Sequence, residues 1–162
     1  MSVIDREVLA ICREVTDKVI LPRFRNLADH HVEDKSASGG GYDPVTIADR
    51  ESELALQEAL EKLAPGLPCV GEEAAHHDAG VLEHLKGPCW IVDPIDGTRN
   101  FASGQPPFGI LIAQADGGVA QSGWIYDCLS GRFCAAHRGK GAFVGGERVT
   151  AMTTGEDPPV AA

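Results

Sequence analysis

Apolar residues recur at helical spacing in two stretches of the chain. From residue 3 to about residue 28 the spacing predicts one amphipathic helix, which Pro22 should kink or briefly interrupt. A second helix is expected from about Arg50 to Ala64, and Pro65-Gly66 should end it. Its apolar face would be formed by Leu56, Ala59, Leu60 and Leu63. Its exposed face would carry Glu51, Glu53, Glu58 and Glu61.

Shorter β-prone runs, separated by turn residues, occupy much of the remaining chain. One strand is expected at 67–71 and a buried strand at 90–92, joined by a polar connection with some helical character around 81–85. An antiparallel meander follows, with strands at 108–113, 119–127, 132–137 and 140–146 and a hairpin turn at Asp116-Gly117-Gly118. The pattern indicates an α+β fold in which two helices pack on an antiparallel sheet. Residues 1–148 are expected to form one domain, and residues 149–162 a loose tail.

The glycine-rich segment 36–41 lies between β-prone residues, which suggests a hairpin with a mobile tip. Such a tip suits an active-site lid, and it equally suits a tolerant surface loop.

Composition narrows the class of protein. A net charge of −10 over 162 residues argues against a nucleic-acid-binding surface, which would be basic. No apolar run approaches the roughly 20 residues that span a bilayer, so no membrane association is expected. The acidic N-terminus does not resemble a secretory signal. Five scattered cysteines without a C-x-x-C pair indicate reduced thiols, so the expected compartment is the cytoplasm. The adjacent histidine pairs lack zinc-ligand spacing and are expected at the surface: His30-His31 and His76-His77.

The chemistry concentrates in residues 90–101. The apolar run 90–92 leads into Asp93, and Pro94 is expected to end strand pairing because it has no N–H. Asp96, Gly97 and Thr98 follow, which brings a second carboxylate, a flexible backbone and a hydroxyl onto one tight turn. Clustered carboxylates suit Mg²⁺, and free N–H groups suit a phosphate. An ordinary surface turn explains Asp-Gly-Thr alone, but it does not explain two acids that directly follow a buried strand.

The segment Asp93–Thr98 resembles the D-P-[IL]-D-G-[ST] signature of the inositol monophosphatase family. These are Mg²⁺-dependent, lithium-sensitive phosphomonoesterases in one superfamily with the fructose-1,6-bisphosphatases. Pro44–Asp49 is similar to the family's P-V-T-x-A-D segment, and Gly71-Glu72-Glu73 is similar to its G-E-E after a strand. The phrases G-W-I-Y-D at 123–127 and G-A-F at 141–143 also match, so the resemblance covers roughly residues 5–148.

The resemblance implies a metal site and assigns its ligands. The carboxylates of Glu72 and Asp93 and the carbonyl of Ile95 would hold one Mg²⁺, and Asp93 and Asp96 would hold a second. A third, weaker ion is conceivable near Lys35, and Mn²⁺ could replace Mg²⁺. The nucleophile would be a water molecule that the metal activates, so no Ser-His-Asp or Cys-His arrangement is expected.

The resemblance also assigns catalytic and substrate-binding roles. Thr98 and Asp49 would orient and deprotonate the water, with Glu72 beside them. Asp49 could equally be the N-cap of the second helix. The small phosphorylated polyol would be bound by Asp96, Gly97, Thr98 and Lys35.

The chain departs from the family in two respects. The family continues into a second α/β half that carries W-D-x-A-A-G, and this motif is absent here. The expected fold is therefore the first half of the layered αβαβα sugar-phosphatase fold, with apolar surface exposed where the second half would pack; a homodimer is one way of covering it. Arg99 also replaces a common threonine, and Arg-Asn-Phe is similar to histidinol-phosphatase-type members.

Several functions therefore stay open. The first is hydrolysis of inositol monophosphate, and a histidinol phosphatase or a 3′-phosphonucleotide phosphatase are alternatives. A truncated, non-catalytic metal-binding module and a purely structural domain are the two readings outside catalysis.

Overall fold

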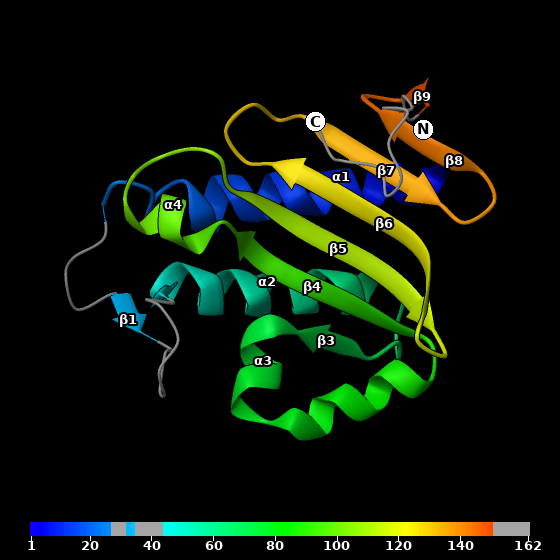
Figure 1. Ribbon diagram of the computed structural model, residues 1–162, viewed down its shortest axis with the longest axis horizontal. Helices are drawn as coiled ribbons and strands as arrows, with labels where there is room; N and C mark the ends of the chain where they lie inside the picture. The colour runs from blue at the N-terminus through cyan, green and yellow to red at the C-terminus, as the bar shows by residue number, and fades with distance from the viewer. Residues whose placement is uncertain (27–31, 35–43, 151–162) are drawn as a thin grey trace, which may run out of the picture.

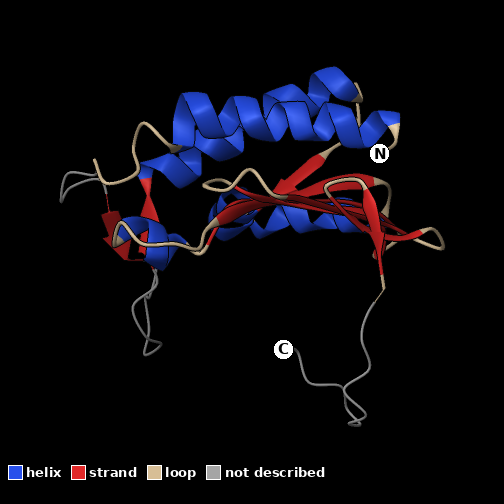
Figure 2. Ribbon diagram, turned by 90° about the horizontal axis from the view of Figure 1, so that it is seen from above, coloured by secondary structure: helices blue, strands red, loops and turns tan. Residues whose placement is uncertain are grey.

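Two long helices cover one face of a seven-stranded sheet in the computed structural model, which describes residues 1–26, 32–34 and 44–150 (Figures 1 and 2). Helix α1 is Val3–Val15 and helix α2 is Ile47–Leu63. The strand order is β3-β4-β5-β6-β7-β8-β9, in which β3 and β4 are parallel and every other pair is antiparallel. The predicted α+β class, with two helices on a largely antiparallel sheet, is confirmed.

The sheet contains the predicted meander and one strand more. Its strands are β3 Cys69–Gly71, β4 Cys89–Asp96, β5 Gly109–Asp116, β6 Val119–Asp127, β7 Phe133–His137, β8 Gly141–Val144 and β9 Glu147–Val149. Gly117 and Gly118 both have positive φ, 57° and 75°, as a two-residue hairpin turn requires. Strand β9 was not predicted, and it runs one residue past the boundary expected at 148. Residues 151–162 of the predicted tail lie outside the described residues.

A short hairpin precedes α2. Strand β1, Val32–Asp34, pairs antiparallel with β2, Pro44–Thr46, which agrees with the predicted hairpin. The glycine-rich segment 36–41 between these strands lies outside the described residues.

The first helix differs from its prediction. Regular α-helix ends at Val15, and the next turn, Thr16–Ile20, is a π-helix in which the Leu21 N–H donates to the Thr16 carbonyl at 2.9 Å. Pro22 explains the difference, because it has no N–H to donate and its ring would clash with the carbonyl four residues earlier. The wider turn opens the hydrogen-bond ladder just before the proline. The last predicted helical residues, 27 and 28, lie outside the described residues.

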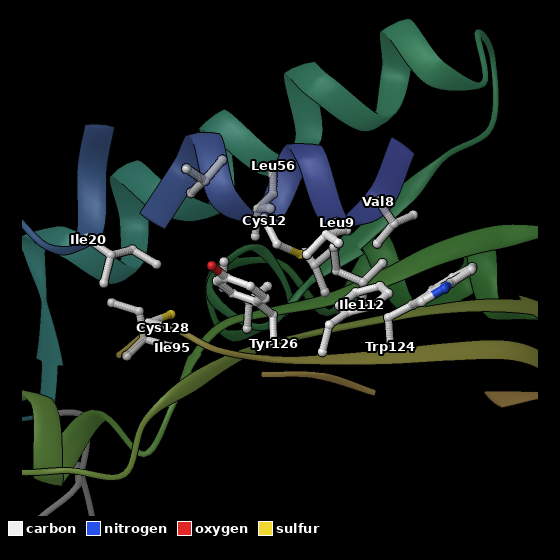
Figure 3. Packing of buried hydrophobic residues seen from close by; sticks show 14 of the residues in the cluster. Val8, Leu9, Cys12, Ile20, Leu56, Ile95, Ile112, Trp124, Tyr126 and Cys128 are labelled. Atoms are coloured by element: carbon white, nitrogen blue, oxygen red, sulfur yellow. The ribbon is translucent and has the colours of Figure 1, made fainter. Parts of the chain in front are cut away.

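The core lies between the two long helices and the sheet (Figure 3). Alternate residues of β4, β5 and β6 point toward the helices, as the two-residue period of a strand demands. Trp90 and Trp124 are both buried, with ring centroids 5.9 Å apart. Helices α1 and α2 add apolar side chains to the same cluster, among them Val8, Cys12, Leu56 and Leu60.

Asp5 joins α1 to the sheet. One oxygen of its carboxylate accepts from the Trp124 indole N–H and contacts Nε2 of His137, both at 2.9 Å, and the other accepts the Ser2 N–H at 2.7 Å. Ser122 Oγ lies 2.9 Å from His137 Nδ1, so Ser122, His137 and Asp5 form a hydrogen-bonded row that the sequence did not predict. The row is structural, because the buried Asp5 carboxylate is shared with Trp124 and with the start of α1.

Within the described ranges, the opposite face of the sheet is covered at one end only. Residues 74–88, predicted as a polar connection, form most of helix α3, Glu72–His77, and a 3-10 helix, Ala79–Lys86. Val81 and Leu85 of this segment pack on Val70, Cys89 and Ala115.

Beyond that end, the same face forms an apolar groove of about 780 Å³. Ile125 in this groove is 53% exposed. The predicted exposure of apolar surface is therefore observed, and the homodimer stays a prediction. None of the helices within the described ranges has the length and apolarity to cross a membrane.

Replacing the Asp5 carboxylate should lower stability in a pH-dependent way. Burial alone would raise the pKa of Asp5, but hydrogen bonds from Trp124 and Ser2 outweigh it and lower the pKa to about 2. The ionised carboxylate therefore favours the folded state at pH values above about 4, and this contribution is lost as pH falls toward 2. Asp5→Asn should lower the free energy of unfolding by about 2 kcal/mol at pH 7 in urea titrations.

Glu7→Gln on the exposed side of α1 is the matched control and should change little. A difference between wild type and Asp5→Asn that stays constant from pH 7 down to pH 2 would contradict this account.

Candidate active site

The acidic turn lies at the end of β4, where the strand leaves the sheet. Pairing with β5 shifts register between Asp93 and Asp96 and then resumes at Asp96. Pro94 therefore produces a bulge, whereas the sequence predicted that it would end the pairing. Because Pro94 has no N–H, one hydrogen bond between β4 and β5 is lost, and β4 bends at this position.

Gly97 and Thr98 complete the turn. Gly97 has φ of 91°, and a Cβ atom there would lie 2.8 Å from the Pro107 carbonyl oxygen, so only glycine fits. Helix α4, Thr98–Ala102, begins directly after it. The prediction of a flexible backbone at Gly97 is confirmed.

Strand β3 brings the third acid to this turn. β3 pairs parallel with β4 (Figure 1). In this pairing Gly71 lies opposite Val92. The next residues, Glu72 and Asp93, therefore emerge at the same edge of the sheet, because parallel strands end on the same side. The segments 67–71 and 89–93 therefore end beside each other.

These residues line one cleft. It has a volume of about 450 Å³ and is lined by Glu72, Asp93, Ile95, Asp96, Gly97, Thr98, Arg99 and Asn100. Six of them are residues predicted to bind metal or substrate. Lys35, the other predicted substrate contact, lies outside the described residues, so its role stays a prediction.

Asp93 interacts electrostatically with both of the other acids in the cleft, Glu72 and Asp96. Burial, the charge of Glu72 and the charge of Asp96, in that order, raise the pKa of Asp93 to about 7. Its Oδ1 atom is buried and has no hydrogen-bond donor among the described residues. A carboxylate in this position repels its neighbours unless a cation or a proton neutralises it.

The donor set fits a hard cation. Carboxylate oxygens of Glu72, Asp93 and Asp96, together with the Ile95 carbonyl, are the ligand types that Mg²⁺ takes. Within the described part of the chain, no three acidic, histidine or cysteine side chains lie close enough to hold a metal as they stand. A cation would therefore have to draw these carboxylates together, and the unpartnered oxygen of Asp93 is available for that purpose.

Asp49 lies behind Thr98. The Thr98 hydroxyl is 3.1 Å from Asp49 Oδ1 and 2.9 Å from the Ile95 carbonyl, and its one proton serves one of them at a time. The other oxygen, Asp49 Oδ2, accepts from the Thr46 N–H at 2.8 Å and from the Thr46 hydroxyl at 2.5 Å. Burial raises the pKa of Asp49, although the Thr46 and Thr98 hydrogen bonds oppose the rise.

The alternative role considered for Asp49, N-cap of α2, is wrong. Thr46 is the N-cap, and Asp49 is the third helical residue of a reciprocal capping box. This box also explains why α2 begins at Ile47, three residues earlier than predicted.

Glu53 was predicted to be exposed, and it is only 4% exposed. Its carboxylate accepts the N–H groups of Glu73 at 2.7 Å and Ala74 at 2.9 Å, in the first turn of α3. A signal for its burial was present in the sequence, because the buried stripe of α2 runs through Asp49, Glu53, Leu56 and Leu60. The signal was overlooked because an acidic side chain such as Glu53 is normally expected at the surface.

Among the described residues, no histidine or cysteine lines the cleft. His76 and His77 are exposed, as predicted, and His30-His31 lie outside the described residues. All five cysteines are free thiols.

Comparison with known proteins assigns the chain to a family. The model of the inositol monophosphatase family matches residues 5–160. A histidinol-phosphatase of Chlorobaculum parvum is 38% identical over 114 residues, which cover 70% of this chain and 42% of the relative. The inositol-1-monophosphatase of Mycobacterium leprae is 35% identical over 119 residues, which cover 68% of this chain and 41% of that relative. This chain belongs to the inositol monophosphatase family.

Solved structures agree on the fold. The extragenic suppressor protein suhB of Bartonella henselae has a TM-score of 0.74 at 26% identity, covering 94% of this chain and 55% of its own. An IMPase of Thermotoga maritima has a TM-score of 0.74 at 27% identity, and the match covers 91% of this chain and 53% of the Thermotoga chain. This chain thus spans about half the length of these structures.

Asp93 should destabilise the protein when no metal is present. Because its pKa is raised to about 7, its ionisation opposes folding as pH rises from about 4 to 7. Asp93→Asn should therefore raise the free energy of unfolding at pH 8, in the presence of EDTA, by about 1–3 kcal/mol. The gain should shrink as pH falls, because protonated Asp93 resembles asparagine.

Asp127→Asn provides a control of opposite sign. The backbone N–H of Ser130 is foremost among the contacts that lower the pKa of Asp127, so its loss should destabilise the protein. An Asp93→Asn variant that is less stable than wild type at pH 8 without metal would refute the like-charge account.

Proposed function

We propose that this chain carries a magnesium-dependent phosphomonoesterase site that hydrolyses a small phosphorylated polyol, with inositol monophosphate as the first candidate. One observation carries the proposal: three acidic residues line a single cleft together with Gly97 and with Thr98, whose hydroxyl lies 3.1 Å from Asp49 Oδ1. Membership of the inositol monophosphatase family supports the same chemistry.

The cation would be held by Glu72, Asp93, Asp96 and the carbonyl of Ile95. When bound, Mg²⁺ supplies a Lewis acid that polarises the phosphate ester and neutralises the charge that develops on it. The four ligands leave one side of the cleft to Gly97 and Thr98, where the phosphate would lie. Mn²⁺ is the natural substitute, because it takes the same oxygen ligands.

Thr98 and Asp49 would orient the attacking water and accept its proton. When the Thr98 hydroxyl donates to Asp49 and not to the Ile95 carbonyl, its oxygen can accept a hydrogen bond from the attacking water. Asp49 is buried and anchored by Thr46, which keeps this pair oriented before the substrate arrives. As the water proton moves to the Thr98 oxygen, the Thr98 proton would pass to Asp49, and burial, which raises the pKa of Asp49, favours this protonated state.

The turn would bind the phosphate, and Arg99 would contribute to specificity for the alcohol part of the phosphate ester. The N–H groups of Gly97 and Thr98 lie at the start of α4 and can donate to phosphate oxygens. Arg99 lines the same cleft and is exposed. The resemblance to a histidinol-phosphatase makes histidinol phosphate the second candidate substrate, and a 3′-phosphonucleotide is the third.

Removing the Thr98 hydroxyl should abolish most turnover. Thr98→Val keeps the side-chain shape and removes the donor to Asp49, so Mg²⁺-dependent phosphate release should fall roughly 10²–10⁴-fold. The assay compares inositol monophosphate, histidinol phosphate and a 3′-phosphonucleotide at saturating Mg²⁺. Ser103→Ala, at the exposed end of α4, is the matched control and should match wild type.

Equal rates for Thr98→Val and wild type would refute the assigned role. A wild-type chain that binds Mg²⁺ and releases no phosphate from any of the three substrates would instead support the non-catalytic metal-binding module.

A further inference from the structure

Glu53 is a buried carboxylate outside the cleft that contacts the segment carrying Glu72. It comes from α2, and its two oxygens accept the N–H groups of Glu73 and Ala74 at 2.7 and 2.9 Å. These N–H groups directly follow Glu72 in the first turn of α3. Glu53 therefore links the backbone beside one candidate metal ligand to helix α2.

The space for this contact is made by Gly71. A Cβ atom on Gly71 would lie 2.1 Å from the Glu53 carboxyl carbon and within 2.4 Å of both its oxygens. The φ of Gly71 is −96°, an angle that any residue adopts, so the backbone conformation does not demand glycine. Glycine is needed at this position because the carboxylate of Glu53 occupies the place of a side chain.

Helix α2 contacts the segments beside the cleft through two carboxylates on one of its faces. Asp49 and Glu53 are four residues apart, which places them one above the other on the helix. Asp49 is linked to Thr98 on one side of the cleft, and Glu53 is linked to the backbone after Glu72 on the other. Helix α2 therefore helps to set the relative position of these two segments, in addition to the pairing of β3 with β4.

We propose that Glu53 is a positioning residue that holds the Glu72 segment against the end of β4, so that Glu72 and Asp93 can bind one cation. This inference rests on the proposed function, since it concerns the same site. Glu53 does not touch the cation or the substrate. It acts through the Glu73 and Ala74 N–H groups, which fix where Glu72 leaves the sheet.

The central test is Mg²⁺ affinity measured by isothermal titration calorimetry on the chain and on Glu53→Gln. The glutamine keeps the size of the side chain and one acceptor, but its NH₂ group opposes a backbone N–H. Mg²⁺ affinity should fall about tenfold or more, in the range found when partners of metal ligands are changed. Circular dichroism at the same temperature must show a folded variant.

Two further variants separate positioning from simple helix stability. Glu58→Gln makes the same chemical change on the exposed side of α2 and should bind Mg²⁺ like wild type. Gly71→Ala leaves Glu53 intact but displaces its carboxylate, and it should lose affinity to a similar extent. The amide resonances of Glu73 and Ala74 should shift in both Glu53→Gln and Gly71→Ala.

The outcomes are distinct. A folded Glu53→Gln variant that binds Mg²⁺ as tightly as wild type overturns this inference and leaves the proposed function intact. A wild-type chain that binds no Mg²⁺ overturns both. If Glu53→Gln does not fold, Gly71→Ala decides in its place, and failure of both variants to fold at 4 °C assigns Glu53 a purely structural role.

Discussion

The parallel pairing of β3 with β4 is the contact on which the site depends. It is the only parallel pair among the described strands, and it makes two strands end at one edge of the sheet. Glu72 and Asp93 follow directly, so the backbone pairing forces two acids together. Like charges at short range are unfavourable, and the charges of Glu72 and Asp96 add to the effect of burial, which is the largest cause of the raised pKa of Asp93. A fold that keeps such a pair is suited to a cation, which converts the repulsion into binding.

Helix α2 gives this arrangement its rigidity. Its capping box with Thr46 fixes the first turn, and the same Asp49 carboxylate reaches Thr98. One turn further on, Glu53 reaches the start of α3. Polar groups that are buried with full hydrogen bonding hold one geometry, because every alternative leaves a carboxylate unpaired. The apolar stripe of α2 packs on the core, and its acidic end organises the cleft.

The sequence predicted the turn at 93–98 well, but it did not predict the contacts from other elements that hold this turn in place. Asp93, Asp96, Gly97 and Thr98 are adjacent in the chain, so local turn chemistry places them together. Glu72 and Asp49 were assigned by resemblance, and their approach depends on strand pairing that no local pattern reveals. The burial of Glu53 was missed because a glutamate among exposed glutamates gives no sign of a partner twenty residues away. The π-helical turn before Pro22 and the continuation of β4 past Pro94 were missed for a related reason: a proline marks a disturbance, and the surrounding packing decides its form.

The most direct test of the central claim is the position of a bound divalent cation. Mn²⁺ is paramagnetic, and in ¹H–¹⁵N spectra it broadens the amide resonances that lie near it. The account predicts selective broadening at Glu72, Asp93, Asp96, Gly97 and Thr98, reversed by excess Mg²⁺. Broadening spread over exposed acids such as Glu58 and Glu61, with the cleft resonances unchanged, would contradict it.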